Sequence, residues 1–137
     1  MSQGFGIIGC GMIAKFHARA IADCSGAQLV ACYNRTADKA EALAAEFGCQ
    51  AYTDLDQMLA RDDVQIVTIG TASGAHCEPA VAAAKAGKHV IVEKPLEVTR
   101  QRCLQMIDAC ERAGVKLATI FPSRFHQASL LLKEAAE

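Results

Sequence analysis

The stretch Phe5-Gly6-Ile7-Ile8-Gly9-Cys10-Gly11-Met12-Ile13-Ala14 decides the fold class of this chain. The apolar run Phe5–Ile8 predicts a short strand that ends at Gly9. Apolar residues spaced three and four apart predict a helix over Met12–Asp23. The residues between them have the spacing G-x-G-x-x-A. A strand, a glycine turn and a helix in this order are typical of the first unit of a dinucleotide-binding fold.

Each small residue of this turn has a physical reason. Gly9 permits the tight turn, Gly11 lets a pyrophosphate approach the backbone, and Ala14 keeps the helix close to the strand. The helix N-terminus offers free N–H groups and a partial positive charge to phosphates. The turn therefore predicts a dinucleotide site. The alternative is a glycine turn that only closes a strand-to-helix corner.

The rest of the chain repeats the strand-then-helix order. Further strands are predicted over 28–33, 50–52, 64–70, 89–92 and 115–121. Helices are predicted over 37–47, 54–60, 73–86, 99–113 and 127–137, with Thr36, Asp54, Ser73 and Thr99 at their starts. Strands without polar alternation, each followed by a helix, indicate a parallel sheet covered on both faces. The predicted fold class is α/β: a doubly wound parallel sheet of the Rossmann type, in three α/β/α layers.

Length, composition and charge narrow the classes of function. The 137 residues are enough for one domain, with 52% hydrophobic and 21% charged residues. A net charge of -1 gives no basic excess for nucleic acid or an anionic membrane, and no apolar run approaches the ~20 residues of a membrane helix. Residues 1–6 lack the features of a signal peptide. Seven cysteines without a C-x-x-C pair argue against a disulfide framework or a metal site and favour a cytoplasmic protein.

The end of the second predicted strand bears on the choice of cofactor. Dinucleotide folds usually place Asp or Glu ~20 residues after the glycine turn, to bind the adenosine ribose. Here that position is Asn34, and Arg35 follows it. Asn34 does not repel a 2′-phosphate, and Arg35 suits a phosphate or stacking on adenine. The pair predicts that NADP is tolerated and leaves open whether NADP is preferred over NAD. The alternative is a polar strand end without a role.

Several stretches together resemble one family. They are Gly9–Ala14 with His17 on the next helix, Asn34-Arg35, Thr71–His76, and Glu93-Lys94-Pro95 after the fifth predicted strand. Over nearly its whole length the sequence resembles the N-terminal domain of the glucose–fructose oxidoreductase/inositol dehydrogenase (Gfo/Idh/MocA) family. The resemblance implies an NAD(P)-dependent oxidoreductase that transfers hydride to or from a sugar, a polyol or a related hydroxy or keto compound.

The resemblance also implies roles for single residues. The pyrophosphate would face Gly9, Gly11, Met12 and Ile13, and the adenosine ribose would face Asn34 and Arg35. Thr71 and His76 would flank the cofactor, and Glu93, Lys94 and a cis Pro95 would lie by the nicotinamide ribose. Lys94 would reach the substrate and act in catalysis. Lys94 beside Glu93 also makes sense without the family, because a lysine can stabilise negative charge that develops on a substrate oxygen. The alternative is a surface ion pair.

The sequence departs from the family in three ways. Ala72 replaces a usual Pro, Asn34 replaces a common Asp, and members are much longer because a second α/β domain supplies most of the substrate pocket. We therefore expect a Rossmann domain over 1–122, with 123–137 as the start of a second domain or a terminal helix. The competing interpretation is a nucleotide-binding module or fragment without turnover of its own, so the sequence leaves enzymatic activity open.

The remaining candidates are secondary. His17 is expected to be a half-buried helix residue, and His76 is balanced between a cofactor role and a structural one. Most cysteines are expected to be core, and Cys10, although it lies near a helix N-terminus that lowers a thiol pKa, is expected to pack rather than to act in redox chemistry. An apolar edge of Phe121, Phe125 and Leu130–Leu132 predicts a homo-oligomer.

Overall fold

The computed structural model describes residues 2–137 and contains six strands, six α-helices and one 3-10 helix. The strands are β1 (Gln3–Ile8), β2 (Ala27–Tyr33), β3 (Gln50–Tyr52), β4 (Ile66–Ile69), β5 (His89–Val92) and β6 (Leu117–Thr119). The helices are α1 (Met12–Asp23), α2 (Ala37–Phe47), α3 (Leu55–Leu59), α4 (Cys77–Lys85), α5 (Arg100–Ala113), η1 (Pro122–Phe125) and α6 (Gln127–Ala136).

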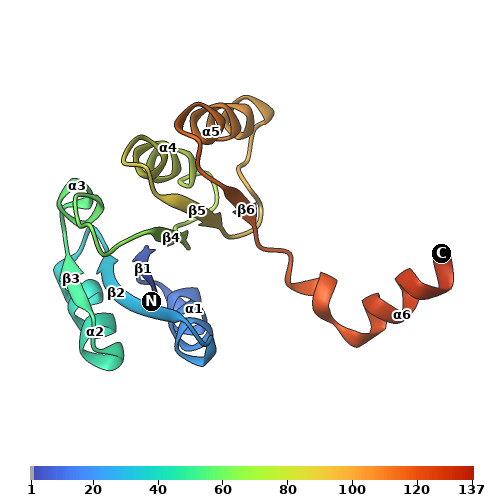
Figure 1. Cartoon of the computed structure of the whole chain (residues 1–137), viewed down its shortest axis with the longest axis horizontal. Coiled ribbons are helices and arrows are strands. Elements are labelled where there is room, and N and C mark those ends of the chain that lie inside the picture. The colour runs from blue at the N-terminus through green and yellow to red at the C-terminus, as the bar shows by residue number, and fades with distance from the viewer. Residues whose placement is uncertain (1) are drawn as a thin grey trace.

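The strands form one parallel sheet in the order β3-β2-β1-β4-β5-β6. The chain runs from β1 outward to β3, returns to β4 beside β1, and then runs outward the other way to β6. Helices α1 and α2 cover one face of the sheet, and α4 and α5 cover the other (Figure 1). The predicted doubly wound Rossmann fold with three layers is confirmed.

Two apolar clusters hold these layers together. Ile7 packs with residues of α1 and α2, such as Ala14 and Leu43, whereas the next residue, Ile8, packs with residues of α3, α4 and α5. Successive side chains of a strand point to opposite faces, so the apolar strand β1 supplies both clusters. Both isoleucines are buried.

Two of the four helix starts predicted from the sequence have a side-chain cap in the structure. The Asp54 carboxylate accepts the N–H groups of Asp56 and Gln57, and Thr99 accepts that of Arg102, as N-caps do. Thr36 makes no capping bond, because its hydroxyl accepts the Asn34 side-chain amide instead. The expectation for Ser73 was wrong, since α4 begins at Cys77. A turn with Gly74 at a φ of +86° delays the helix.

The strand bounds also differ slightly from the prediction. β4 and β6 are shorter than the predicted 64–70 and 115–121, although the N–H groups of Gln65, Gly70 and Ile120 still donate to carbonyl oxygens of the neighbouring strands. The short helix η1 was not predicted.

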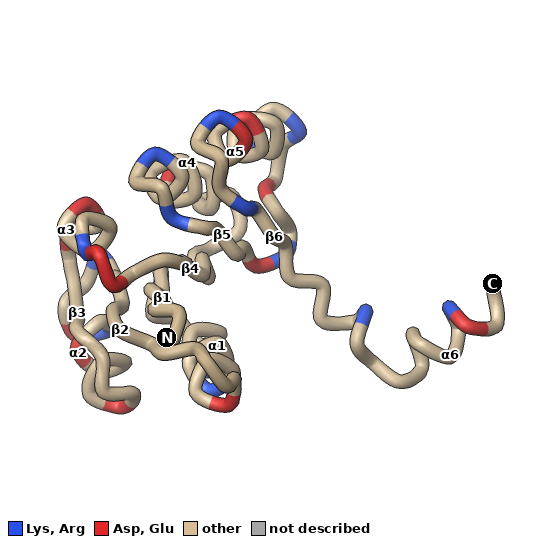
Figure 2. Tube along the Cα trace, in the orientation of Figure 1, with Lys and Arg blue, Asp and Glu red and all other residues tan. Residues whose placement is uncertain are grey.

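The C-terminal segment projects away from the sheet. Helix α6 follows η1 and extends to one side of the layers (Figure 1), and none of its residues is buried. The division into a unit over 1–122 and a second over 123–137 stays a prediction. Lys, Arg, Asp and Glu are interspersed along the chain (Figure 2), and no helix within residues 2–137 has the length and apolar character needed to cross a membrane.

Candidate cofactor site

The glycine turn after β1 has the geometry that a phosphate site needs. Gly9 has a φ of +94°, and a Cβ there would lie 3.0 Å from the Thr71 backbone nitrogen. Gly11 has extended backbone, and a Cβ there would meet nothing within 4 Å. Gly9 is therefore required by the turn itself, whereas Gly11 leaves open space in front of the backbone. That space adjoins the N-terminus of α1, where no side chain caps the free N–H groups.

A second glycine lets α1 approach the sheet closely. A Cβ on Gly70, which follows β4, would lie 2.7 Å from the Ile13 Cγ2 atom. Ala14 is fully buried one turn into the helix. The first turn of α1 is thus seated between the carboxyl ends of β1 and β4, the two strands at which the winding of the sheet reverses.

A cavity of about 520 Å³ opens at this point. The ends of β1, β2 and β4 contribute Gly9, Gly11, Asn34, Arg35, Gly70 and Thr71 to its lining. Five of the predicted cofactor residues therefore line one cavity. Met12 is exposed beside it, and Ile13 is half-buried under Gly70. The open glycine turn, the uncapped helix N-terminus and this cavity fit a dinucleotide.

Asn34 connects the end of β2 to the glycine turn. Its Oδ1 accepts the Cys10 N–H at 3.1 Å, and its Nδ2 donates to the Thr36 hydroxyl at 2.7 Å. The amide of Asn34 is therefore held in one orientation before any ligand binds. Arg35 and Lys39 line the same end of the cavity, and the structure gives neither an ion pair within residues 2–137.

Glu93, Lys94 and Pro95 follow β5 at the same edge of the sheet. Glu93 is buried, and its carboxylate accepts the Lys94 N–H at 3.1 Å and lies 2.9 Å from His17 Nε2. Lys94 itself is exposed, and the Lys94–Pro95 peptide bond is cis. Lys94 and Pro95 line a separate, open cavity with residues 121–124.

The structure buries His76 away from the first cavity. Its ring nitrogens lie 3.0 Å from the Pro95 carbonyl oxygen and 3.1 Å from that of Thr71. His76 thus joins the loop after β4 to the loop after β5, a structural contact. Its proposed contact with a cofactor stays a prediction.

Below His76, the Glu97 carboxylate accepts the N–H groups of His76 and Cys77 at 3.3 and 3.0 Å. Because the start of α4 has no cap of its own, a residue from the next loop supplies it. Burial alone would raise the pKa of Glu97, but N–H donation from Val98 and Cys77 and the nearby Arg102 guanidinium outweigh it. The net effect lowers that pKa.

The thiols near the glycine turn lie in the core. Cys10 and Cys32 are buried in the cluster under α1 and α2. Hydrogen bonding from the Cys32 thiol lowers the pKa of Cys10, and the same contact raises that of Cys32 to about 12. These cysteines pack as the sequence predicted.

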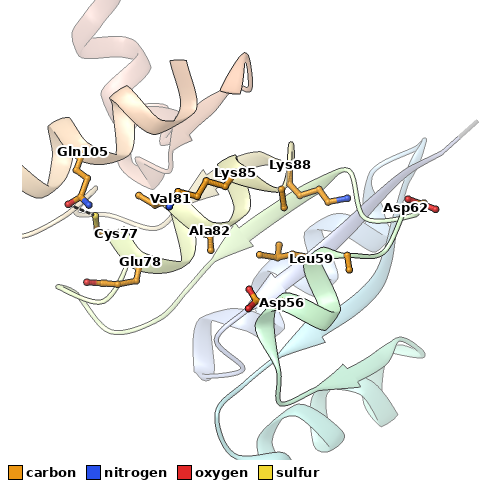
Figure 3. Close-up of a pocket in the computed structure, with 12 residues that line it drawn as sticks. Asp56, Leu59, Asp62, Cys77, Glu78, Val81, Ala82, Lys85, Lys88 and Gln105 are labelled. Atoms are coloured by element: carbon orange, nitrogen blue, oxygen red, sulfur yellow. Dashed lines mark hydrogen bonds between the residues drawn. The ribbon is translucent and has the colours of Figure 1, made fainter. Parts of the chain in front are cut away.

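A neighbouring cavity of about 800 Å³ shares Glu78 and Ala82 with the first. Figure 3 shows it between α3 and α4, with Leu59, Val81 and Ala82 along its apolar part. It extends to Asp62 and Lys88, which precede β4 and β5 and so lie toward the amino ends of the strands. Ligands of open α/β sheets bind at the carboxyl ends, so this groove is not the cofactor site.

Comparison with known proteins gives the same assignment. Residues 3–121 match the GFO_IDH_MocA family, described as an oxidoreductase family with an NAD-binding Rossmann fold. This chain belongs to that family. The resemblance seen in the sequence is therefore confirmed for the family and for its fold.

Individual relatives are similar over nearly all of this chain. An inositol 2-dehydrogenase from Salmonella typhimurium is 36% identical over 137 residues, which cover 97% of this chain and 41% of the relative. The WlbA dehydrogenase from Bordetella pertussis, solved with NADH and UDP-GlcNAcA, matches at 33% identity and a TM-score of 0.95 over 99% of this chain and 42% of its own. KijD10, a 3-ketoreductase from Actinomadura kijaniata solved with NADP, matches at 26% identity and a TM-score of 0.92. The match covers 99% of this chain and 44% of KijD10. The chain thus spans about two fifths of the length of these three proteins.

Sequence reasoning did not identify three residues that shape this site. Lys39 lies one helical turn beyond Arg35, and its place on α2 was a usable signal. The sequence gave no such signal for Glu97 or Thr68. Glu97 accepts the Cys77 N–H and Thr68 contacts the His17 ring, and these partners are distant in sequence.

Proposed function

We propose that this chain is the cofactor-binding part of an NAD(P)-dependent oxidoreductase that acts on a sugar, a polyol or a related hydroxy or keto compound. The observation that supports it most is the open glycine turn at the reversal point of the sheet, in front of the cavity lined by Asn34 and Arg35. When bound, the cofactor supplies hydride transfer at the nicotinamide C4 carbon. The chain's own residues bind it, orient it and provide charge near the substrate.

In this proposal the glycine turn binds the pyrophosphate. The backbone at Gly9 and Gly11 and the first N–H groups of α1, at Met12 and Ile13, face its oxygens. Thr71 lies across the turn, in van der Waals range of Gly9. His76 holds the loop that carries Thr71 and so positions Thr71 beside the cofactor.

Asn34, Arg35 and Lys39 receive the adenosine ribose. No carboxylate stands at position 34 to repel a 2′-phosphate, and two cations line the cavity. Glu78 also lines it, and its carboxylate is paired at 2.6 Å with Arg102, which faces Glu97 as well. We therefore propose that NADP is accepted, and preferred over NAD, in the cavity end next to β2.

Lys94 is the proposed catalytic residue. Its exposed side chain follows β5 at the edge where the nicotinamide would lie, with Glu93 and Pro95 shaping the turn. An ammonium group there stabilises negative charge on the substrate oxygen as the hydride moves. One relative is an inositol 2-dehydrogenase and another was solved with the nucleotide sugar UDP-GlcNAcA, which supports a polyhydroxylated substrate.

The wider setting is also proposed. Residues 123–137 would start a second domain or form a terminal helix, copies of the chain would associate through the exposed apolar edge, and the seven free thiols suit a reducing cytoplasm.

A titration of the chain with NADH and NADPH tests this function. Backbone amide shifts at Gly9–Ala14 and Asn34 should move on binding, with the tighter affinity for NADPH. Saturating cofactor that leaves those amides unmoved would contradict the proposal.

A further inference from the structure

His17 is engaged at both nitrogens of its ring. It projects from α1 toward the sheet, where Nδ1 lies 2.7 Å from the Thr68 hydroxyl oxygen and Nε2 lies 2.9 Å from Glu93 Oε1. The His17 and Glu93 side chains are each 11% exposed, and Thr68 is buried in the middle of β4. The His17 ring, on α1, therefore connects Thr68 on β4 to Glu93 at the end of the neighbouring strand β5.

For a neutral ring, one arrangement of hydrogens satisfies every group in this chain of contacts. An ionised carboxylate only accepts, so Nε2 carries the proton that Glu93 receives. The neutral ring then accepts at Nδ1, and the Thr68 hydroxyl is the donor. The second Glu93 oxygen, Oε2, accepts the Lys94 N–H at 3.1 Å. The links run without a gap from β4 through α1 to the turn after β5.

Lys94 depends on these links because its side chain is exposed and makes no hydrogen bond or ion pair within residues 2–137. Its backbone N–H is anchored, and the anchor is the Glu93 carboxylate. Glu93 could rotate if His17 did not hold its other oxygen. The direction in which Lys94 leaves the sheet is thus set two contacts away, by a residue on α1.

We propose that His17 is a positioning residue: held by Thr68, it fixes the Glu93 carboxylate on the Lys94 amide and so aims Lys94 at the nicotinamide edge of the site. The inference rests on the role proposed above for Lys94. The contacts themselves are independent of any cofactor, so they can be tested without one.

Four variants of the full chain separate positioning from packing. His17→Gln keeps an N–H donor near the place of Nε2, whereas His17→Leu keeps an apolar volume and removes the donor. Thr68→Val removes the hydroxyl with little change of shape. His89→Leu is the matched control, because the His89 ring is also bonded at Nδ1, where it accepts the Lys116 N–H, but His89 begins β5 at the opposite edge of the sheet.

The first readout is amide hydrogen exchange at Lys94 in the absence of cofactor. We expect the Lys94 amide to exchange at least about tenfold faster in His17→Leu, because this variant should lose one charge-assisted hydrogen bond. In His17→Gln the exchange rate of the Lys94 amide should stay within about threefold of that in the parent chain, since the glutamine side chain restores the donor. His89→Leu should not change this amide. Nitrogen shifts of the His17 ring should report the Nε2–H tautomer, and Thr68→Val, which releases Nδ1 while Glu93 still accepts from Nε2–H, should speed exchange at the Lys94 amide.

The contrast between Gln and Leu decides the matter. If Leu protects the Lys94 amide as well as Gln does, His17 only fills space and the proposal is overturned. If His17→Leu does not fold, Thr68→Val decides, because a Lys94 amide that exchanges there as it does in the parent chain would also overturn the proposal. A parent chain that binds neither NADH nor NADPH would refute the proposed function, while the exchange data would still test the positioning of Lys94.

Discussion

Asn34 shows how one side chain can serve both the turn and the ligand. Its amide bridges Cys10 and Thr36, and the same residue lines the cavity beside Arg35 and Lys39. The carbonyl oxygen of Asn34 explains why position 34 need not be charged to hold the glycine turn. The charge at this position is then free to set the choice of cofactor.

We predict that Asn34→Asp weakens NADPH relative to NADH by at least about tenfold, because a carboxylate ~5 Å from the 2′-phosphate costs about 3 kcal/mol at an effective dielectric of ~20. Paired titrations with both cofactors measure the ratio. Gln28→Glu, which adds the same charge at the other end of β2, is the control. A ratio that does not move in Asn34→Asp would place the 2′-phosphate elsewhere.

At the scale of elements, α4 is held by a residue outside it. Glu97 lies in the loop before α5, is fully buried at its side chain, and accepts the first N–H groups of α4. In the folded chain these contacts favour the carboxylate form, so the pKa of Glu97 lies below the ordinary value of 4.5. A group with a lowered folded pKa stabilises the fold above its unfolded pKa, and this contribution is lost as the pH falls through the folded value.

We therefore predict that Glu97→Gln lowers the free energy of unfolding at pH 7 by about 1–3 kcal/mol. The difference from the parent chain should shrink as acid protonates Glu97 itself. Urea unfolding at neutral and acid pH measures both values, with the exposed Glu111→Gln on α5 as the control. Equal stability of Glu97→Gln and the parent chain at pH 7 would show that this cap contributes nothing.

The same elements show what the sequence could predict. The turn at Gly9–Ala14 and the helix ends at Gly48 and Gly114 depend on local backbone conformation, and they were predicted correctly. Ser73 was misplaced as a cap because the Gly74 turn precedes α4. The pairing of His17 with Glu93 joins residues 76 positions apart, and periodicity holds no information on such contacts.

At the scale of the whole molecule, the C-terminal segment stands apart from the layers (Figure 1). Phe125 is 80% exposed and Leu132 is 72% exposed, and Phe121, Leu130 and Leu131 are exposed near them. Apolar side chains gathered in this way usually mark an interaction surface.

We predict that the chain self-associates through this segment. Sedimentation at increasing concentration should show dimers or larger species, and Phe125→Ser with Leu132→Ser should reduce them. Val98→Ser, which removes another exposed apolar side chain, on the loop before α5, should not. A monomer at high concentration would count against the prediction.

We also predict that the chain by itself turns over less than about one substrate per second, the low end of ordinary enzymes. Lys94 is exposed and the cavity beside it is open, whereas hydride transfer needs a closed site that excludes water. Steady-state assays with NADPH and a panel of keto sugars measure the rate. Faster turnover would reveal a complete active site within these residues.

The glycine turn remains the central claim, and Gly11→Val tests it most directly. Gly11 has extended backbone that any residue adopts, and a Cβ there meets nothing within 4 Å, so the variant should fold. The added side chain would occupy the space proposed for the pyrophosphate. Fluorescence titration with NADH and NADPH should show affinities at least about tenfold weaker than those of the parent chain. The exposed Ala45→Val on α2 should bind as the parent does. Unchanged affinity for both cofactors in a folded Gly11→Val chain would contradict the account.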